Sequence, residues 1–299
     1  MKNFLVGNIQ KQICAALLLF LTLNASAKVH EFDVSSIDGT KIAVQESGDQ
    51  SKPTIVFIHG YMGTHLNWDK QISSELANRF HMVTYDLRGH GNSGKPTNAL
   101  AYKEGKRWAD DLDAVISSLG RKEVVLVGWS LGGAVISNYL AYYGESKISS
   151  AIYVDGVIEL NSELITPHPE VYKGLLSDSL ELRVSSIRDF LELCFLNKPQ
   201  EEIFEVLLGS ATIASLEMQK NVQSMTIPVE DAFNRMNKPI YLLYGKHDDL
   251  IKVNPTLKRA KELHKNSQIF MFDESGHAPF LEEARLFNSI LSDIVLNQK

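Results

Sequence analysis

The sequence predicts an α/β fold built on a mostly parallel, doubly wound sheet, with a helical cap inserted between two of its strands. Short apolar runs alternate with helical patterns along the chain. The runs are apolar almost throughout, which is typical of parallel strands buried on both faces. Residues 157–237 differ, because helical spacing occurs there without any strand-like run. The alternation therefore predicts the sheet, and its interruption predicts the cap.

The strands can be assigned in chain order. Two early segments, VHEFDV and KIAVQES, are separated by Asp38-Gly39 and predict an antiparallel hairpin at the edge of the sheet. Six later runs carry the pattern of strands buried on both faces. They occupy residues 54–60, 82–86, 124–128, 151–156, 239–245 and 268–274.

Helical periodicity marks both the last helix and the cap. Near the C-terminus, Phe287, Ile290, Leu291 and Ile294 recur at the spacing of one helix face, and Glu282 is expected where this helix starts. An apolar stripe in the cap includes a cysteine, which we interpret as a packed thiol rather than a nucleophile. The stripe consists of Ile187, Phe190, Leu191, Cys194 and Phe195.

Residues 1–27 have the order of a secretory signal peptide. Lys2 and Lys11 precede or border an apolar run, and Ala25 and Ala27 complete an A-x-A cleavage site. The run has about half of the roughly 20 apolar residues that a transmembrane helix needs. We therefore expect cleavage near Ala27 and export to the periplasm or the medium, with no stable membrane anchor. The expected domains are a signal peptide (1–27), an α/β core in two parts (28–156 and 238–299) and a cap (157–237).

Charge and cysteine content limit the partners of the exported chain. The formal net charge is −6, and removal of the leader, which holds two lysines and no acid, makes it −8. An acidic surface argues against nucleic acid and anionic membrane as partners. Cys194 is the only cysteine after the leader, so no intramolecular disulfide is expected and the core must supply the stability. The composition specifies no oligomeric state.

Chemically capable residues follow five of the predicted strands, at their carboxyl ends. Active sites of parallel sheets lie at this edge, so we expect these segments to converge. A serine, an acid and a histidine occur among them in that order. The segments are HGYMG (59–63), DLRGHGNS (86–93), GWSLGG (128–133), GKHDDL (245–250) and SGHAPFLEE (275–283).

Together these segments resemble those of the α/β-hydrolase fold family, and the resemblance covers nearly all of the chain after the leader. GWSLGG is similar to the nucleophile elbow of the serine-nucleophile branch, which includes esterases and haloperoxidases. HGYMG is similar to its oxyanion loop, GKHDDL to its acid loop and SGHAPFLEE to its histidine segment. A sharp strand-to-helix turn leaves no room for bulky residues two positions from the serine, and Gly128 and Gly132 meet that need.

The resemblance implies a catalytic triad of Ser130, Asp248 and His277. Ser130 would be the nucleophile, His277 the general base and acid, and Asp248 the group that fixes the imidazole tautomer. The resemblance also implies an oxyanion hole formed by the backbone N–H groups of Tyr61 and Leu131. The second of these lies at a helix start, where the helix dipole favours negative charge.

Other polar residues near the predicted site compete for these roles. Asp249 is adjacent to Asp248, but the family spacing places the acid three residues after Gly245. Asp155 follows another strand and is the runner-up, although a structural role in the turn VDG is the stronger interpretation. Arg88 is expected to tie loops together rather than to bind substrate.

Two further patterns suggest cofactor or metal sites and are interpreted otherwise. GHGNSG (89–94) fits G-x-G-x-x-G after a strand, and Asp110 and Asp111 follow it. A proline occurs where a helix should open, so dinucleotide binding is not expected. Asp110 and Asp113 are interpreted as the solvated face of a helix. H-E-x-x-H and paired cysteines are absent from the sequence, and we expect neither a metal nor a cofactor.

These observations predict an enzyme that hydrolyses carboxylic esters of small to medium apolar substrates through an acyl-serine. A lactonase, a thioesterase or a cofactor-free haloperoxidase (perhydrolase) would use the same triad and is the alternative. A non-catalytic ligand-binding module on the same fold is a more remote one, against which the complete triad argues. A serine rather than an aspartate at the nucleophile position argues against dehalogenase and epoxide hydrolase chemistry.

Overall fold

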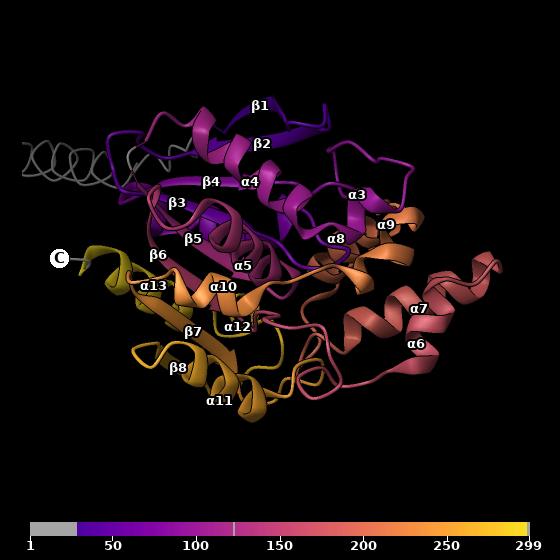
Figure 1. The fold of residues 1–299 in the computed structure, drawn as a ribbon. Coiled ribbons are helices and arrows are strands. Elements are labelled where there is room, and N and C mark those ends of the chain that lie inside the picture. Colours follow the sequence, from indigo (N-terminus) through magenta and orange to yellow (C-terminus); the bar gives the residue numbers. More distant parts are fainter. Residues whose placement is uncertain (1–28, 122, 298–299) are drawn as a thin grey trace, which may run out of the picture.

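The computed structural model describes residues 29–121 and 123–297, and the signal peptide predicted over residues 1–27 lies outside them. In this part of the chain, eight strands form one sheet in the order β1-β2-β4-β3-β5-β6-β7-β8 (Figure 1). The strands are β1 (His30–Ser35), β2 (Lys41–Ser47), β3 (Thr54–Ile58), β4 (His81–Tyr85), β5 (Val124–Trp129), β6 (Ile148–Val154), β7 (Ile240–Gly245) and β8 (Gln268–Phe272).

The sheet is antiparallel only at its N-terminal edge. β1 pairs antiparallel with β2, which confirms the predicted hairpin, and β2 pairs antiparallel with β4. The remaining neighbours, from β4 to β8, are parallel. The carboxyl ends of β3 to β8 therefore meet at one edge, and this edge receives the predicted functional segments.

The last strand departs from its prediction. The run over residues 268–274 was expected to be buried on both faces, but Ile269 and Met271 are each 39% exposed. In the described sheet β8 is an edge strand that pairs with β7 alone, so neighbouring elements cover it incompletely. The apolar run predicted a strand correctly and its burial wrongly.

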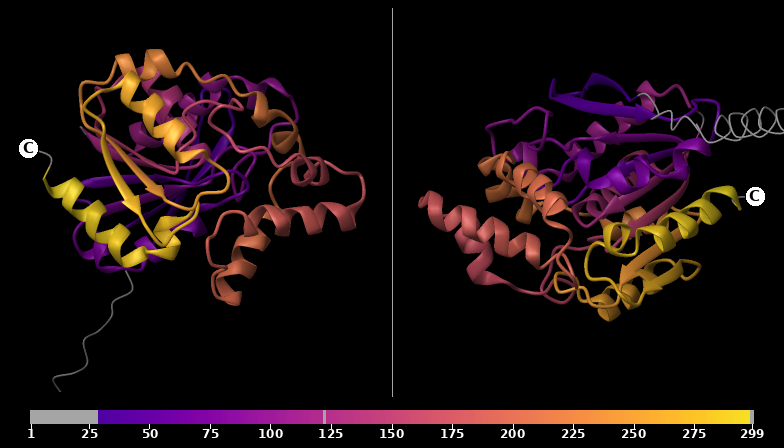
Figure 2. Two further views of the ribbon diagram at one scale, coloured as in Figure 1. Left: turned by 90° about the horizontal axis from the view of Figure 1, so that it is seen from below. Right: turned by 180° about the vertical axis from the view of Figure 1, so that it is seen from behind.

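Helices cover both faces of the sheet (Figures 1 and 2). α4, α5 and α10 pack in a row on one face, and α2, α12 and α13 gather on the other. In α13, Phe287, Leu291 and Ile294 are buried as the periodicity predicts. The bounds are η1 (His65–Trp68), α2 (Asp69–Ile72), η2 (Glu75–Asn78), α3 (Leu100–Lys103), α4 (Gly105–Ser118), α5 (Leu131–Tyr143), α10 (Val229–Asn234), α11 (Val253–Leu263), α12 (Pro279–Glu282) and α13 (Ala284–Leu296).

The remaining helices lie between β6 and β7 in sequence and stand beyond the strand ends, at the right of Figure 1. α7 packs against α6 and α8, α8 contacts η1, and α9 contacts α3. α10 occurs in the same stretch of sequence but packs against α5. No helix of the described ranges is both long and apolar enough to span a membrane. The bounds are α6 (Pro169–Leu175), α7 (Leu180–Glu192), α8 (Glu201–Thr212), α9 (Leu216–Asn221) and η3 (Val222–Ser224).

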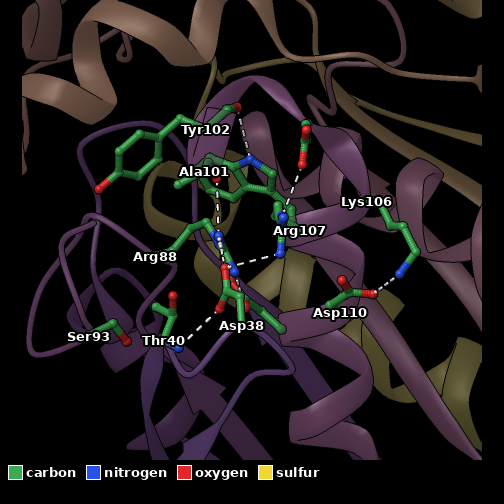
Figure 3. A network of polar contacts seen from close by, with 12 residues as sticks. Asp38, Thr40, Arg88, Ser93, Ala101, Tyr102, Lys106, Arg107 and Asp110 are labelled. Carbon is green, nitrogen blue, oxygen red and sulfur yellow. Dashed lines mark hydrogen bonds and ion pairs between the residues drawn. The ribbon is translucent and has the colours of Figure 1, made fainter. Parts of the chain in front are cut away.

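A buried guanidinium ties the loop after β4 to its surroundings, as expected for Arg88 (Figure 3). Its Nε and one terminal nitrogen each donate to Asp111 of α4 at 2.6 Å. The other terminal nitrogen donates to Asp38, in the β1–β2 turn, and to the carbonyl of Ala101 of α3, both at 3.1 Å. Burial alone would lower the pKa of Arg88, but these two acids hold it above its usual value. We call Arg88, Asp111 and Asp38 the arginine cluster.

The neighbouring acid Asp110 corrects a second prediction. It was assigned to a solvated helix face, but it is only 5% exposed. Its carboxylate accepts hydrogen bonds from Lys106 Nζ and from the Tyr143 hydroxyl, each at 2.6 Å (Figure 3 shows the lysine). Asp113 is half-buried and pairs with Lys147 at 2.7 Å. The packing of α5 against α4 covers this face, which the periodicity of α4 alone does not reveal.

Candidate active site

Ser130 occupies the turn between β5 and α5. Its φ of 51° lies in the left-handed region, which is costly for a residue with a side chain. Three backbone hydrogen bonds hold this conformation: its N–H donates to Val154 at 3.0 Å, and its carbonyl accepts from Gly133 and Val157 at 2.9 Å. The turn presents Ser130 at the carboxyl edge of the sheet, directly before the first helical N–H groups.

The glycines around Ser130 are required by close backbone contacts. A Cβ on Gly128 would lie 2.5 Å from the carbonyl oxygen of Gly132, and one on Gly132 would lie 2.5 Å from that of Ile58. Real Cβ atoms do not approach so closely, so the reason given for both glycines is confirmed. A Cβ on Gly60 would lie 3.0 Å from the Cβ of Ser130. The loop after β3 therefore passes directly beside the serine.

The two N–H groups assigned to the oxyanion hole flank Ser130. Leu131 is the first residue of α5, so its N–H has no partner within the helix. Tyr61 follows Gly60 in the loop after β3, and its side chain lines one pocket together with Ser130 and Leu131. The structure thus places both residues beside the serine, and the role of their N–H groups in an oxyanion hole stays a prediction.

Two buried histidines hold the loop that carries Tyr61. His59 Nδ1 bonds the carbonyl of Gly60 at 2.8 Å, and its Nε2 accepts from the N–H of Leu87 at 2.9 Å. His90 Nε2 accepts from the N–H of Met62 at 3.2 Å. Burial lowers the pKa of His59 to about 4 and that of His90 to about 3, so both are neutral at pH 7. Their contacts are structural, because both rings bond backbone groups of the loops after β3 and β4.

His277 and Asp248 form a buried hydrogen-bonded pair. His277 Nδ1 lies 2.7 Å from Asp248 Oδ2, and the two side chains are 1% and 0% exposed. Asp248 Oδ1 accepts from the N–H groups of Leu250 and Ile251 at 2.8 and 2.9 Å, which fixes the carboxylate. With Nδ1 donating to the acid, Nε2 carries the lone pair. This is the protonation state that a general base requires.

The other ring nitrogen of His277 is buried and has no hydrogen-bond partner among the described residues. Consequently Ser130 and His277 make no hydrogen bond to each other in this structure. Trp129, the residue before the serine, donates its indole N–H to the carbonyl of His277 at 2.7 Å. Unliganded hydrolases often have looser catalytic hydrogen bonds than their complexes. The indole contact places the histidine backbone beside the serine turn, and sequence reasoning missed it.

The two competing aspartates occupy different positions. Asp249 is exposed, and only its backbone carbonyl is engaged, by His168 at 2.9 Å. Asp155 is fully buried at the end of β6 and lies next to the pair, but His277 bonds Asp248 instead. One ligand-type atom from each of Asp155, Asp248 and His277 falls within 4.8 Å of the others. Two of these three groups already satisfy each other, which suits an acid–base relay better than a shared cation.

A narrow pocket of about 50 Å³ opens beside Ser130. The ring of Phe190 in α7 packs edge-on against Tyr61 at 5.4 Å between centroids and also contacts Tyr172 of α6. Helices α6 and α7 of the cap therefore cover the pocket beside Ser130. Phe190 belongs to the apolar stripe predicted for the cap, and the structure brings it into the wall of the pocket. The lining residues from the cap and the acid loop include Tyr172, Phe190, Val222, Gln223, Leu250 and Ile251.

Glu282 connects the cap to the histidine loop. It ends α12, close to the expected helix start, and one carboxylate oxygen accepts from the N–H of Gly276 at 2.8 Å. The other accepts from the N–H groups of Leu196 and Asn197 at 2.7 and 3.1 Å. Burial raises the pKa of Glu282 despite these donors. The sequence offers no signal for the contact with the cap, because Leu196 and Asn197 lie 86 and 85 positions from Glu282.

A parallel sheet with a strained serine after a central strand, and a buried Asp–His pair at the same edge, defines an α/β hydrolase. The comparison with known families agrees, because the family described as alpha/beta hydrolase fold matches residues 53–284. The chain therefore belongs to the α/β hydrolase fold family.

Similar proteins share nearly the whole chain. A Burkholderia cenocepacia crystal structure described as a "putative aryl esterase" is 47% identical, with a TM-score of 0.89, and the match covers 90% of this chain and 99% of that one. The bifunctional esterase/perhydrolase DCH of Acinetobacter calcoaceticus is 26% identical over 86% of this chain and 97% of its own length. A non-heme haloperoxidase of Rhodococcus erythropolis is 23% identical over 88% and 98%.

Proposed function

We propose that this protein is a serine hydrolase that cleaves carboxylic esters of small to medium apolar substrates through an acyl-enzyme on Ser130. One observation carries the proposal: a buried His277–Asp248 pair lies at the same sheet edge as the strained serine, and Nε2 of its histidine has no hydrogen-bond partner among the described residues. The 47% identity to a protein described as an aryl esterase supports the same reaction class.

In the acylation step, Ser130 Oγ attacks the ester carbonyl while its proton passes to His277 Nε2. The carbonyl oxygen becomes an oxyanion, and the N–H groups of Tyr61 and Leu131 stabilise it. Asp248 stabilises the imidazolium that forms. The tetrahedral intermediate then breaks its bond to the alkoxy oxygen, and Nε2 returns the proton to the departing alcohol.

The deacylation step repeats this chemistry with water. Nε2 takes a proton from a water molecule as the water oxygen attacks the acyl carbonyl. The bond to Ser130 Oγ breaks, the serine regains its proton from Nε2, and the carboxylic acid leaves. The chain's own residues supply every proton transfer in this cycle.

The pocket favours small groups next to the serine. Its volume of about 50 Å³ is far below the roughly 300–1,000 Å³ of pockets that hold drug-sized ligands. Apolar and aromatic side chains form most of its wall, with Gln223 as a polar exception. A short acyl chain fits this space, whereas a long one requires α7 to move.

Perhydrolysis is the second candidate, because the Acinetobacter calcoaceticus relative is named a bifunctional esterase/perhydrolase. Hydrogen peroxide would replace water in the second step and release a peracid from the same acyl-serine. Lactone and thioester hydrolysis would also use this cycle with a different leaving group.

The predicted signal peptide indicates in which compartment the protein acts. We propose export to the periplasm or the medium, supported by the order of charges, apolar run and A-x-A motif in residues 1–27. Cell fractionation and N-terminal sequencing of the isolated protein should find it outside the cytoplasm, beginning at Lys28. An intact N-terminus on cytoplasmic protein would contradict export.

The deciding experiment is hydrolysis of p-nitrophenyl esters, from acetate to dodecanoate, by wild type and Ser130→Ala. Short esters should be the best substrates, and loss of the serine should lower kcat by about 10⁶. Equal turnover by both proteins would overturn the role of Ser130. If the wild type hydrolyses none of these esters, the proposal of esterase activity is wrong. Serine-dependent peracid formation or lactone opening would then replace it, and ligand binding without turnover would indicate a binding module.

A further inference from the structure

The mechanism above leaves one buried acid unused. Asp155 follows β6 and Asp248 follows β7, and these neighbouring parallel strands bring both acids to the same edge of the sheet. Asp155 is 0% exposed, and its φ of 42° places it in the left-handed region. Aspartate tolerates this conformation better than most residues, but a buried acid there still has a cost.

The contacts of Asp155 account for only one of its two oxygens. Oδ1 accepts from the N–H of Gly245 at 2.9 Å, at the start of the acid loop. Oδ2 is buried and receives no hydrogen bond from any donor of the described residues. Asp248 accepts from Leu250, Ile251 and His277 through its own oxygens.

Acidic groups outnumber basic ones around Asp155 in the described part of the chain. The titratable groups that face it are the carboxyls of Asp248 and Glu282, the phenol of Tyr244 and the imidazole of His277. Tyr244 donates its O–H to the carbonyl of Gly156 at 2.6 Å, so it is already engaged. No lysine or arginine is among these groups. Two adjacent buried carboxylates repel each other strongly, and one of such a pair keeps a proton.

We propose that Asp155 is the protonated member of this pair and donates its O–H to the Asp248 carboxylate, making it a positioning residue for the triad acid. The inference rests on the proposed function of the same site. Oδ1 anchors the start of the acid loop, and the acid proton on Oδ2 supplies the Asp248 carboxylate with a further donor. Burial, followed by the Asp248 charge, raises the pKa of Asp155 well above its usual value, in agreement with this geometry.

Two substitutions at Asp155 test the proposal against ester hydrolysis. In Asp155→Asn, the amide oxygen can accept from Gly245 and the NH₂ group can donate to Asp248, as the protonated acid does. This variant should keep kcat within about fivefold of wild type. Asp155→Ala should lower kcat by about 10- to 100-fold with little change in KM, the loss expected for one hydrogen bond to a charged group. Asp249→Asn, at the exposed neighbour, is the matched control and should behave as wild type.

The two variants differ from each other under the proposal and behave alike under either competing explanation. If Asp155 were the ionised triad acid, the asparagine would be as damaging as the alanine, which would overturn the proposal. If Asp155 only filled space in the turn, neither variant would change kcat, which would overturn it as well. At alkaline pH the wild type should lose activity as Asp155 ionises beside Asp248, whereas Asp155→Asn should keep it.

A folding measurement tests whether Asp155 holds a proton in the folded protein, and it needs no substrate. A carboxyl whose pKa is raised in the folded state contributes stability below its unfolded pKa of about 4, and this is lost as pH rises towards the folded pKa. The folding equilibrium constant of wild type, relative to Asp155→Asn, should therefore fall about tenfold per pH unit above about pH 4, until Asp155 ionises in the folded protein. A constant ratio would overturn the proposal. Failure of every ester assay would remove the proposed function and leave this readout intact.

Discussion

Two buried charge clusters among the described residues are organised in opposite ways. In the arginine cluster, one guanidinium faces two acids, and each of its three nitrogens donates to a carboxylate or carbonyl oxygen. In the second, which we call the acid cluster, Asp155 and Asp248 lie close to one imidazole, that of His277, which bonds Asp248 alone of the two. Two of its polar atoms, Asp155 Oδ2 and His277 Nε2, have no hydrogen-bond partner among the described residues.

The difference separates a structural cluster from a chemical one. Complete pairing offsets the cost of burying charge and leaves no lone pair or proton for a reaction. Incomplete pairing costs stability but provides a base with an unengaged lone pair, held by an acid that cannot move. Removing a member should therefore reduce stability in the first cluster and turnover in the second.

The largest effect is expected from Asp248→Asn. An asparagine cannot hold His277 with its proton on Nδ1, so kcat should fall by about 10⁴ while the folded structure persists. Asp249→Asn changes an exposed neighbour and should leave kcat close to wild type. Ester turnover and circular dichroism of both variants provide the measurement. Similar losses for both would assign the triad acid elsewhere.

The arginine cluster should give the opposite result. Asp111→Asn leaves the buried guanidinium short of one carboxylate, and the free energy of unfolding should fall by about 3–5 kcal/mol. The kcat of the protein that remains folded should stay within a few-fold of wild type. Asp113→Asn, which breaks a partly exposed pair with Lys147, should cost about 1 kcal/mol or less in urea denaturation. A large loss of kcat without lost stability would make the cluster part of the chemistry.

Lowering the pH should reduce the free energy of unfolding through the two histidines that are buried in their neutral form. His59 and His90 have folded pKa values of about 4 and about 3, below the unfolded value near 6.5. Their contribution is present above pH 6.5 and is lost as pH falls towards the folded values. At pH 5.5 each should lower the free energy of unfolding by about 1.4 kcal/mol relative to neutral pH. Urea denaturation of His90→Asn should have a shallower pH dependence, and the exposed His247→Asn should retain the wild-type one.

A smaller effect on kcat is expected from Trp129→Phe, because this substitution changes only how the backbone of His277 is held in the acid cluster. The substitution removes the indole N–H that binds the His277 carbonyl, so kcat should fall by about tenfold, equivalent to one lost hydrogen bond. Trp68→Phe is the control, because the indole N–H of Trp68 is buried and has no partner in the described ranges. Equal kcat for both variants would leave Trp129 without a positioning role.

The sequence predicted most of the sheet because parallel strands leave a local signal. The hairpin and the six apolar runs became strands, and the glycines flanking Ser130 proved necessary. The same reasoning failed for β8 and Asp110, where burial depends on which element happens to cover a residue. The strand run and the helix periodicity are properties of short segments, but the cover comes from segments far along the chain.

Local spacing alone determined the fold class and the order in which a serine, an acid and a histidine reach one edge of the sheet. It did so because strand ends and strand-to-helix turns are built by neighbouring residues. Tertiary structure decided which acid His277 binds, that Phe190 and Tyr172 narrow the pocket, and that Asp155 is buried close to Asp248. These are contacts between segments as far apart as Trp129 and His277, and their geometry exists only once the core has packed.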